Sequence, residues 1–476
     1  MTMSIRANRF LVASIAAATL ASCTVGPNYL RPAADTPAAY KEMPAAKPAE
    51  PADTVSRGSW WEIYGDAELN RLAEAVVPAN QNLRVAEANY RQAQAAVRAA
   101  RSGFYPTVGA NVNVDRARAG GNTQTLYTLG LPVDWEIDLW GKIRRSVEQS
   151  ESTALASAAD IENTRLSLQA QLAQAYFALR TADRQKKLQD ETVAAYQRSV
   201  DLTQNRYSAG VVARSDVVQA EAQLQQAQVQ AVEIQLTRAQ LEHAIAVLIG
   251  KPPSDFSLPP TDTLPAVPPI PAAIPSELLE RRPDIAASER RVAAANAQIG
   301  VATAAFYPSL SLSGNLGFAS TSFASWISLP KRAWSVGASL AQTLFDAGLR
   351  TAQRDEAIAA YDATVATYRQ TVLNGFQQVE DNMAALRILQ DEAQVQATAL
   401  ASARQAVELA LNQYRAGLVN YINVVLLQAA ALSAERNAVE LDGRRLAASA
   451  TLITALGGGW RTSDLPSPSQ VAETPP

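Results

Sequence analysis

The chain contains one sequence pattern twice, and this internal repeat limits the possible folds more than any other feature. Phe104-Tyr105-Pro106 recurs as Phe306-Tyr307-Pro308, a shift of 202 residues. A Tyr-x-Ala-Gly motif at 207–210 recurs at 414–417, a shift of 207 residues. Several motifs that recur in the same order indicate one structural unit used twice. Because the shift changes by five residues between the two motifs, we expect a difference in loop length between them.

Each unit is expected to contain a helix, two strands, a long helix and a further helix. A segment with nine prolines in 25 residues separates the units, and proline removes backbone donors and disfavours helix, so it predicts an extended crossover. The predicted divisions are the signal 1–22, an extended arm 23–65, unit one 66–250 (strands 104–117 and 123–137, helices 142–206 and 213–249), the crossover 251–275, unit two 276–457 (strands 306–318 and 333–344, helices 347–414 and 420–456) and a tail 458–476.

The predicted strands have apolar residues at alternate positions. In the first strand Val108, Ala110, Val112 and Val114 alternate with small or polar residues, and the other three strands follow the same rule. Alternation over about 9–11 residues fits a membrane β-barrel strand, although a half-buried soluble sheet gives the same pattern. Aromatic residues beside the strands favour the membrane interpretation. They are Phe104, Tyr105, Trp135, Trp140, Phe306, Tyr307, Trp334 and Phe345.

Four strands are too few to close a membrane barrel, since the smallest such barrels have about eight. Open strand edges in lipid would leave backbone groups without hydrogen-bond partners. If these strands span a membrane, several chains must therefore share one barrel.

The helices following the Tyr-x-Ala-Gly motifs carry a seven-residue apolar repeat. From Val217 to Leu248 nine of ten stripe positions are apolar, and the exception is Arg238. The same stripe recurs 207 residues later with Arg445 as its only exception. This spacing predicts left-handed coiled coils. The preceding long helix would extend about 95 Å at 1.5 Å per residue, and Gly210 and Gly417 are placed to end such helices.

The first residues read as a lipoprotein signal. Arg6 and Arg9 precede the apolar run 10–21, and Leu-Ala-Ser-Cys ends at Cys23, the predicted lipid attachment site. An ordinary secretory signal with a chance cysteine is the alternative. Thr24 follows the cysteine, and by analogy with lipoprotein sorting this predicts the outer membrane.

Composition excludes several classes of function. A single cysteine and a single histidine, His243, leave no disulfide framework and no cysteine- or histidine-based metal cluster within one chain. A formal charge of -3 argues against nucleic acid. No nucleophile–base spacing or phosphate loop is present, so we expect neither an enzyme nor a cofactor.

Eight longer segments, spread over essentially the whole mature chain, carry a family resemblance. They are CTVGPNYLRP (23–32), WWEIYGDAELNRL (60–72), WEIDLWGKIRR (135–145), LLERRPDIAASERRVAAANAQIG (278–300), AAFYPSLSLSG (304–314), TLFDAGLR (343–350), YRAGLVNYINVV (414–425) and ALGGGW (455–460). In these segments the chain resembles TolC-type outer membrane factors, in the lipoprotein (OprM/NodT-like) branch that serves multidrug efflux systems.

The resemblance implies an α+β membrane protein that is a homotrimer. Each chain would give four strands to a twelve-stranded outer-membrane β-barrel and its helices to a periplasmic α-helical coiled-coil barrel. The implied function is a passive exit duct of a tripartite efflux system. Its partners would be a periplasmic adaptor (membrane fusion protein), an inner-membrane RND pump and outer membrane lipid.

The helix turns 206–216 and 413–423 should form the periplasmic tip, although their residues could also be turn residues only. Family members often carry acidic residues where this chain has Val419 and Leu426, so an acidic, cation-selective gate is not carried over. The residues expected to dock the adaptor are Tyr207, Gly210, Val211, Tyr414, Gly417 and Leu418, and those expected to shape the gate are Arg214, Asp216, Tyr421 and Asn423.

Two alternative functions remain open at this point. A duct for type I protein secretion would use the same architecture with another pump. A lipid-anchored periplasmic coiled-coil scaffold would not cross the membrane, but the alternating strands and their aromatic neighbours argue against it.

Overall fold

The computed structural model describes residues 24–42, 59–269 and 278–473. The predicted signal 1–22 and Cys23 lie outside these ranges. Within them, none of the helices is both long enough and apolar enough to cross a membrane.

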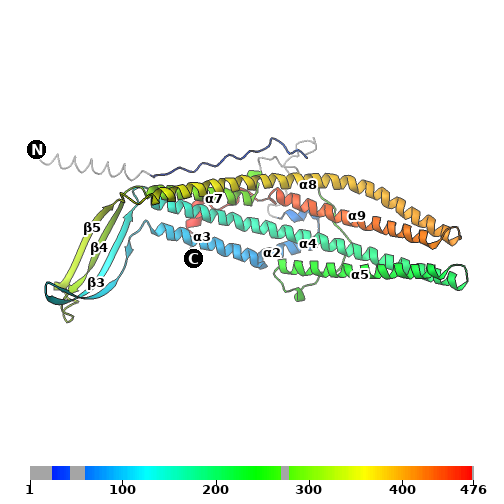
Figure 1. Ribbon diagram of the computed structural model, residues 1–476, viewed down its shortest axis with the longest axis horizontal. Coiled ribbons are helices and arrows are strands. Elements are labelled where there is room, and N and C mark those ends of the chain that lie inside the picture. Colours follow the sequence, from blue (N-terminus) through cyan, green and yellow to red (C-terminus); the bar gives the residue numbers. More distant parts are fainter. Residues whose placement is uncertain (1–23, 43–58, 270–277, 474–476) are drawn as a thin grey trace.

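The molecule is elongated, with the sheet at one end and the turns between the longest helices at the other (Figure 1). Shorter helices pack against the long ones in the middle. The elements are η1 (Trp60–Tyr64), α2 (Ala67–Ala79), α3 (Gln81–Ser102), β1 (Thr107–Val108), β2 (Asn111–Ala119), β3 (Asn122–Ile137), α4 (Lys142–Ser208), α5 (Arg214–Leu248), η2 (Pro253–Asp255), α6 (Leu278–Arg281), α7 (Pro283–Ala304), β4 (Ser309–Ser320), η4 (Leu329–Lys331), β5 (Arg332–Ala341), α8 (Leu349–Arg415), α9 (Tyr421–Ala455), η5 (Thr462–Asp464) and α10 (Pro468–Glu473).

Helices at related positions have equal lengths. α4 and α8 contain 67 residues each, and α5 and α9 contain 35 each. A helix of 67 residues extends about 100 Å. One contact also recurs at the 207-residue shift: the Gln189 amide donates to the Ala227 carbonyl at 2.9 Å, and the Gln396 amide to the Ala434 carbonyl at 2.8 Å.

The first helical region of unit one is divided into two helices. Asn80 has an extended backbone, and its side chain caps α3 by accepting from the Asn82 amide at 2.8 Å. The division arises because Asn at this position offers the backbone a hydrogen-bonded alternative to helix. The strand region also begins later than the sequence suggested: Phe104 and Tyr105 lie in the turn after α3, and β1 starts only after Pro106. Likewise β4 starts after Pro308, which has no N–H to donate to a ladder.

The described parts of the predicted arm and tail pack against the helices. Of the predicted arm, 24–42 contacts α7 and α8, where the Tyr29 hydroxyl donates to the Glu289 carboxylate and Tyr40 is buried. In the predicted tail, Val471 of α10 is buried against residues of α3 and α4.

The sheet is antiparallel throughout and is ordered β1–β3–β4–β5, with β2 also paired to β3. Side chains of directly opposed residues lie on the same face, so the register sorts residues by face. One face carries Val112, Val114, Tyr127, Leu129, Leu131, Val133, Trp135, Ile137, Leu310, Leu312, Leu316, Phe318, Trp334, Val336, Ala338 and Leu340. The other carries Asn111, Asn113, Asp115, Thr128, Asp134, Glu136, Ser311, Ser313, Asn315, Ser335 and Ser339.

The apolar face is largely exposed in the single chain: Trp334 and Val336, for example, are 76% and 81% accessible. Among the described strands, β2 and β5 each have a partner on one side only. One chain therefore presents an uncovered apolar face and two open edges.

Gly317 is required for the pairing of β3 with β4. A Cβ at this position would lie 1.9 Å from the Leu129 carbonyl oxygen, whereas a Cβ at Gly314 meets nothing closer than 3.8 Å. Because backbone atoms cannot give way as side chains do, Gly317→Ala is expected to cost about 1–3 kcal/mol or more. Gly314→Ala is the matched control. Thermal unfolding of the two purified variants checks this, and equal melting temperatures would contradict it.

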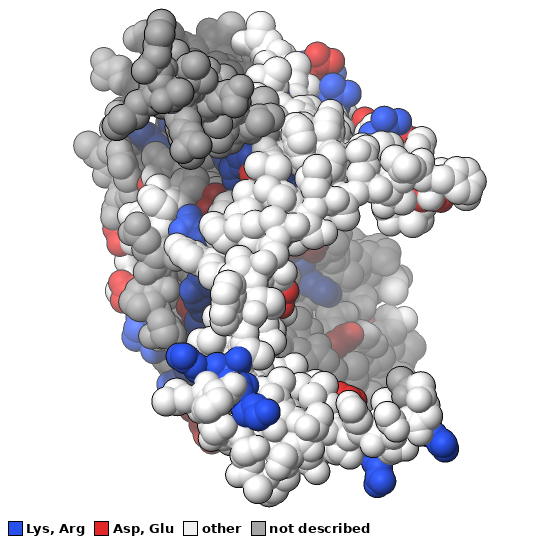
Figure 2. Space-filling model, turned by 90° about the vertical axis from the view of Figure 1, so that its left-hand side faces the viewer, with Lys and Arg blue, Asp and Glu red and all other residues white. Residues whose placement is uncertain are grey.

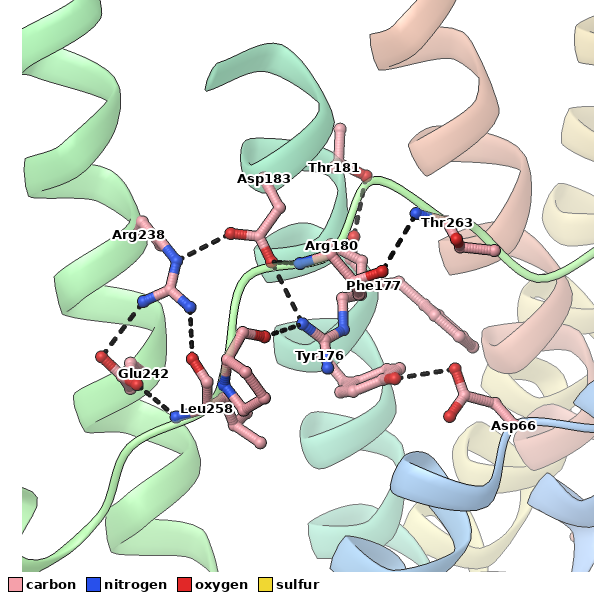
Figure 3. A network of polar contacts seen from close by, with 12 residues as sticks. Asp66, Tyr176, Phe177, Arg180, Thr181, Asp183, Arg238, Glu242, Leu258 and Thr263 are labelled. Carbon is pink, nitrogen blue, oxygen red and sulfur yellow. Dashed lines mark hydrogen bonds and ion pairs between the residues drawn. The ribbon is translucent and has the colours of Figure 1, made fainter. Parts of the chain in front are cut away.

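A buried polar network joins the crossover to α4 and α5 (Figure 3). Asp183 of α4 accepts from the Arg238 Nε of α5 at 2.7 Å and from the Arg180 Nη1 at 3.1 Å. The same carboxylate accepts from the backbone amide of Thr261, at 3.2 Å. Asp183 and Arg180 have side chains only 2% and 3% exposed, so this ion pair is shielded from water.

The crossover backbone completes the network. Arg238 donates to the Leu258 carbonyl at 2.6 Å, and Glu242 accepts from the Leu258 amide at 2.5 Å. Arg180 donates to the Pro259 carbonyl at 2.9 Å. These contacts satisfy backbone groups that a proline-rich segment cannot pair internally, which explains how an extended crossover is held in place.

Candidate functional site

Two helix turns form the tip of the molecule opposite the sheet: α4 turns into α5 and α8 turns into α9 (Figure 1). In the first, the Val211 amide donates to the Arg206 carbonyl at 2.9 Å and the Gly210 amide to the Tyr207 carbonyl at 2.9 Å. The second repeats this pattern at Leu418 and Gly417, with 2.9 and 3.0 Å. Such bonds close a helix through a left-handed residue, and Gly210 and Gly417 have φ of 71° and 77°.

Arg206 links the two turns within the chain. Its Nη1 donates to the carbonyl oxygens of Tyr414, at 2.9 Å, and Arg415, at 3.3 Å. Its guanidinium carbon lies 4.6 Å from the centre of the Tyr414 ring. Both carbonyls belong to the last turn of α8, where a cation is favoured by the helix dipole. The contact therefore fixes the end of α4 to the end of α8.

Tyr414 and Tyr421 are the centre of a small core at the tip. Each is 2% exposed, and their ring centres are 5.3 Å apart. Burial raises the pKa of the Tyr421 hydroxyl above its ordinary value. The hydroxyl therefore stays protonated through the neutral range. Ala220, Ala410, Val424 and Val425 complete this core.

The residues expected to dock an adaptor divide into two groups. Tyr207, Val211 and Leu418 are 40%, 61% and 75% exposed. Tyr414, by contrast, is buried beneath Arg206, so an adaptor could not touch its side chain without opening the core. Gly210 and Gly417 supply the left-handed conformation of the two turns.

The residues expected to shape the gate are also divided. Arg214 and Asn423 are exposed and Asp216 is half-buried, whereas Tyr421 belongs to the tip core. Within the described part of the chain, neither Arg214 nor Asp216 forms an ion pair. Both charges therefore remain available to groups outside a single chain.

Arg206 is a tip residue that the sequence reasoning missed. Arg206 carried one signal: it falls in the last turn of a predicted helix, where the related position in unit two is Gln413. Because only unit one has a cation in this turn, the sequence could have indicated a contact of Arg206 that the second unit does not repeat.

The tip holds no feature of a catalytic centre. Across the described ranges, no group of three or more His, Cys, Asp and Glu residues is placed to hold a metal ion. Its polar side chains join helix ends to one another or point away from the core, an arrangement suited to mechanical contact between helices.

Comparison with known proteins connects this architecture to a family. Residues 73–251 and 274–458 match the family described as outer membrane efflux protein. The probable efflux pump outer membrane protein TtgC of Pseudomonas putida is 30% identical over 459 residues, covering 94% of this chain and 95% of that protein. The cation efflux system protein CusC of Escherichia coli is 27% identical over 448 residues, covering 93% and 97%.

Solved structures agree. The outer-membrane channel OprN superposes with a TM-score of 0.85 at 34% identity, covering 92% of this chain and 100% of that one. The open state of the MtrE outer membrane channel of Neisseria gonorrhoeae gives a TM-score of 0.81 at 28% identity, covering 92% and 99%.

Proposed function

The chain belongs to the outer membrane efflux protein family, and from this premise we propose that it is the exit channel of a tripartite efflux system. It conducts drugs and other small molecules passively from a periplasmic adaptor and an inner-membrane RND pump to the exterior. The observation that carries the proposal is the two-faced sheet. Its apolar face continues through every described strand. The sheet is joined to α4 and α8, which are each about 100 Å long and could therefore extend far into the periplasm.

The sheet favours a shared barrel. With one partnered side each, β2 and β5 are open edges, which lipid does not tolerate. Three chains would pair β5 of one with the β2 edge of the next and close twelve strands, with the apolar face toward lipid and the polar face toward the channel. The helices below would form a coiled-coil barrel from two related units per chain, and Cys23 would carry the lipid anchor.

The alternatives are less well supported. A type I protein secretion duct would have the same geometry, but the relatives named above are efflux components. A periplasmic scaffold would leave the apolar face of the sheet in water, where large contiguous apolar patches are unfavourable.

Reconstitution tests the channel. The purified lipoprotein is expected to migrate as an oligomer in mild detergent and to give discrete conductance steps in planar bilayers. A water-soluble monomer that never perforates a bilayer would refute the proposal.

At the tip, we infer that the exposed side chains of Tyr207, Val211 and Leu418 contact the adaptor while Tyr414 supports them from beneath. Arg214, Asp216 and Asn423 would meet their counterparts across the closed aperture, with Tyr421 holding the helix that carries Asn423. Val419 packs at the tip core and Leu426 is exposed. Because both side chains are apolar, neither supplies a charge to the gate.

Cysteine crosslinking tests the docking surface. Val211→Cys and Leu418→Cys keep the turns intact, whereas cysteine at Gly210 or Gly417 would be strained at positive φ. We expect both variants to capture the adaptor in cells, identified by mass spectrometry. Leu329→Cys, exposed at the sheet end, is the control. Equal capture of the adaptor by the control would contradict a docking tip.

A further inference from the structure

We propose that Arg116, Arg118 and Arg332 form a belt that binds the phosphate groups of lipid headgroups in the outer leaflet of the outer membrane. This inference rests on the proposed channel function, which places the sheet in that membrane.

The strand register sets these three side chains on the apolar face of the sheet. On β2, Arg116 and Arg118 continue the alternation of Val112 and Val114, because every second residue of a strand lies on the same face. On β5, Arg332 lies directly opposite Phe318 of the apolar face. The acidic residue of this region, Asp115, falls on the polar face. Charge is therefore sorted by face, with cations on the side proposed to meet lipid.

The belt lies at the end of the sheet that is remote from the helices. Arg116 and Arg118 precede the Gly120-Gly121 turn between β2 and β3, and Arg332 is the first residue of β5. The helices attach at the opposite end, where Trp140 stacks on Tyr307 with ring centres 4.8 Å apart. The apolar face thus has aromatic residues near both ends, since Tyr127 packs against Phe323 and Trp326 at the remote end, and the three arginines lie at that remote end.

The three residues are exposed, and their guanidinium groups are unpaired within the described ranges. None of them forms an ion pair or hydrogen bond with another described residue, unlike Arg350 at the helical end, which binds Asp346 at 2.6 Å. Lys331 adds a fourth exposed cation beside Arg332. Figure 2, which looks onto the sheet end, shows basic side chains projecting at the lower margin of this face.

The chemistry of the belt selects phosphate. Guanidinium presents a planar fork of donors that matches phosphate oxygens, and its apolar stem can lie along a hydrophobic surface while the charge reaches the headgroup. Each basic residue beside an anionic lipid surface strengthens the binding of that surface. A trimer would repeat the three arginines around its circumference and so contact several headgroups at once.

The test compares a charge-removing variant with a matched control. The belt variant is Arg116→Gln/Arg118→Gln/Arg332→Gln, and the control is Arg91→Gln/Arg198→Gln/Lys251→Gln, which removes three exposed charges from the helical part. Each protein is titrated in detergent with fluorescent bisphosphorylated lipid A, with competition by dephosphorylated lipid A or by inorganic phosphate.

We expect the belt variant to bind lipid A at least about tenfold more weakly than the wild type, and the control variant to bind it normally. Neither dephosphorylated lipid A nor inorganic phosphate should displace the fluorescent lipid well from the wild type. Equal affinity of belt variant and wild type, or full competition by inorganic phosphate, would overturn the inference.

Conductance in planar bilayers separates the two proposals. Wild-type conductance by the belt variant shows that it is folded, so that its lipid affinity reports on the belt. An additional Arg-to-Lys variant at the three positions keeps the charge and should retain part of the binding. If the wild type itself fails to conduct, the channel proposal is refuted instead.

Discussion

Replacing Asp183 with alanine is expected to lower the free energy of unfolding by about 3–5 kcal/mol. The substitution removes the carboxylate that accepts from Arg238, Arg180 and the Thr261 amide. The buried Arg180 guanidinium would then lie in the protein interior without this counter-charge, and Arg238 would keep only Glu242. Such a loss is costly because the desolvation of the remaining charges is no longer offset.

The repeat supplies a matched control for this variant. The residue 207 positions after Asp183 is Gln390, and it accepts from Arg445, the counterpart of Arg238. That pair is exposed, so Gln390→Ala should change the melting temperature little. Thermal unfolding followed by circular dichroism measures both variants. Similar shifts in the two would contradict a special role for the buried network.

Two further measurements localise the effect. Chymotrypsin cleavage after Phe256 in the crossover should accelerate in Asp183→Ala, because the crossover loses one of its attachments to α4. Combining Asp183→Leu with Arg238→Met removes charge on both sides and should destabilise less than the two single variants together. Strict additivity would show that the two residues do not act as a pair.

Replacing Arg206 with alanine should have the largest effect on gating. The variant loses charge-assisted hydrogen bonds to two α8 carbonyls and the contact with the Tyr414 ring. These interactions together are worth about 2–3 kcal/mol. If they are present only when the tip is closed, their loss shifts the balance toward the open state by about 30- to 150-fold. We therefore expect a leaky channel.

Single-channel recording and uptake of large antibiotics measure this leak. Arg198→Ala is the control, since Arg198 is an exposed residue of the same helix whose side chain forms no ion pair or hydrogen bond with another described residue. Arg206→Lys keeps the charge but not the planar fork, and it should leak to an intermediate extent. Normal conductance and uptake in Arg206→Ala would show that the contact does not restrain the tip.

Local sequence patterns anticipated the helices closely. The long helix of unit one was expected at 142–206 and is observed at Lys142–Ser208, and the expected 420–456 is observed at Tyr421–Ala455. Periodicity and terminal glycines suffice here because both report on neighbouring residues. The division at Asn80 was missed because the helical pattern continues across it, although Pro78 and the capping side chain of Asn80 both disfavour an unbroken helix there.

Tyr207 and Tyr414 show what the sequence by itself can determine and what it cannot. Tyr207 and Tyr414 occupy the same position of the repeated motif, and the sequence alone fixed the turn that follows each. Only the tertiary structure exposes the first and buries the second beneath Arg206. The reason is physical: a turn depends on the conformational limits of adjacent residues, whereas burial depends on which distant helix comes to lie alongside.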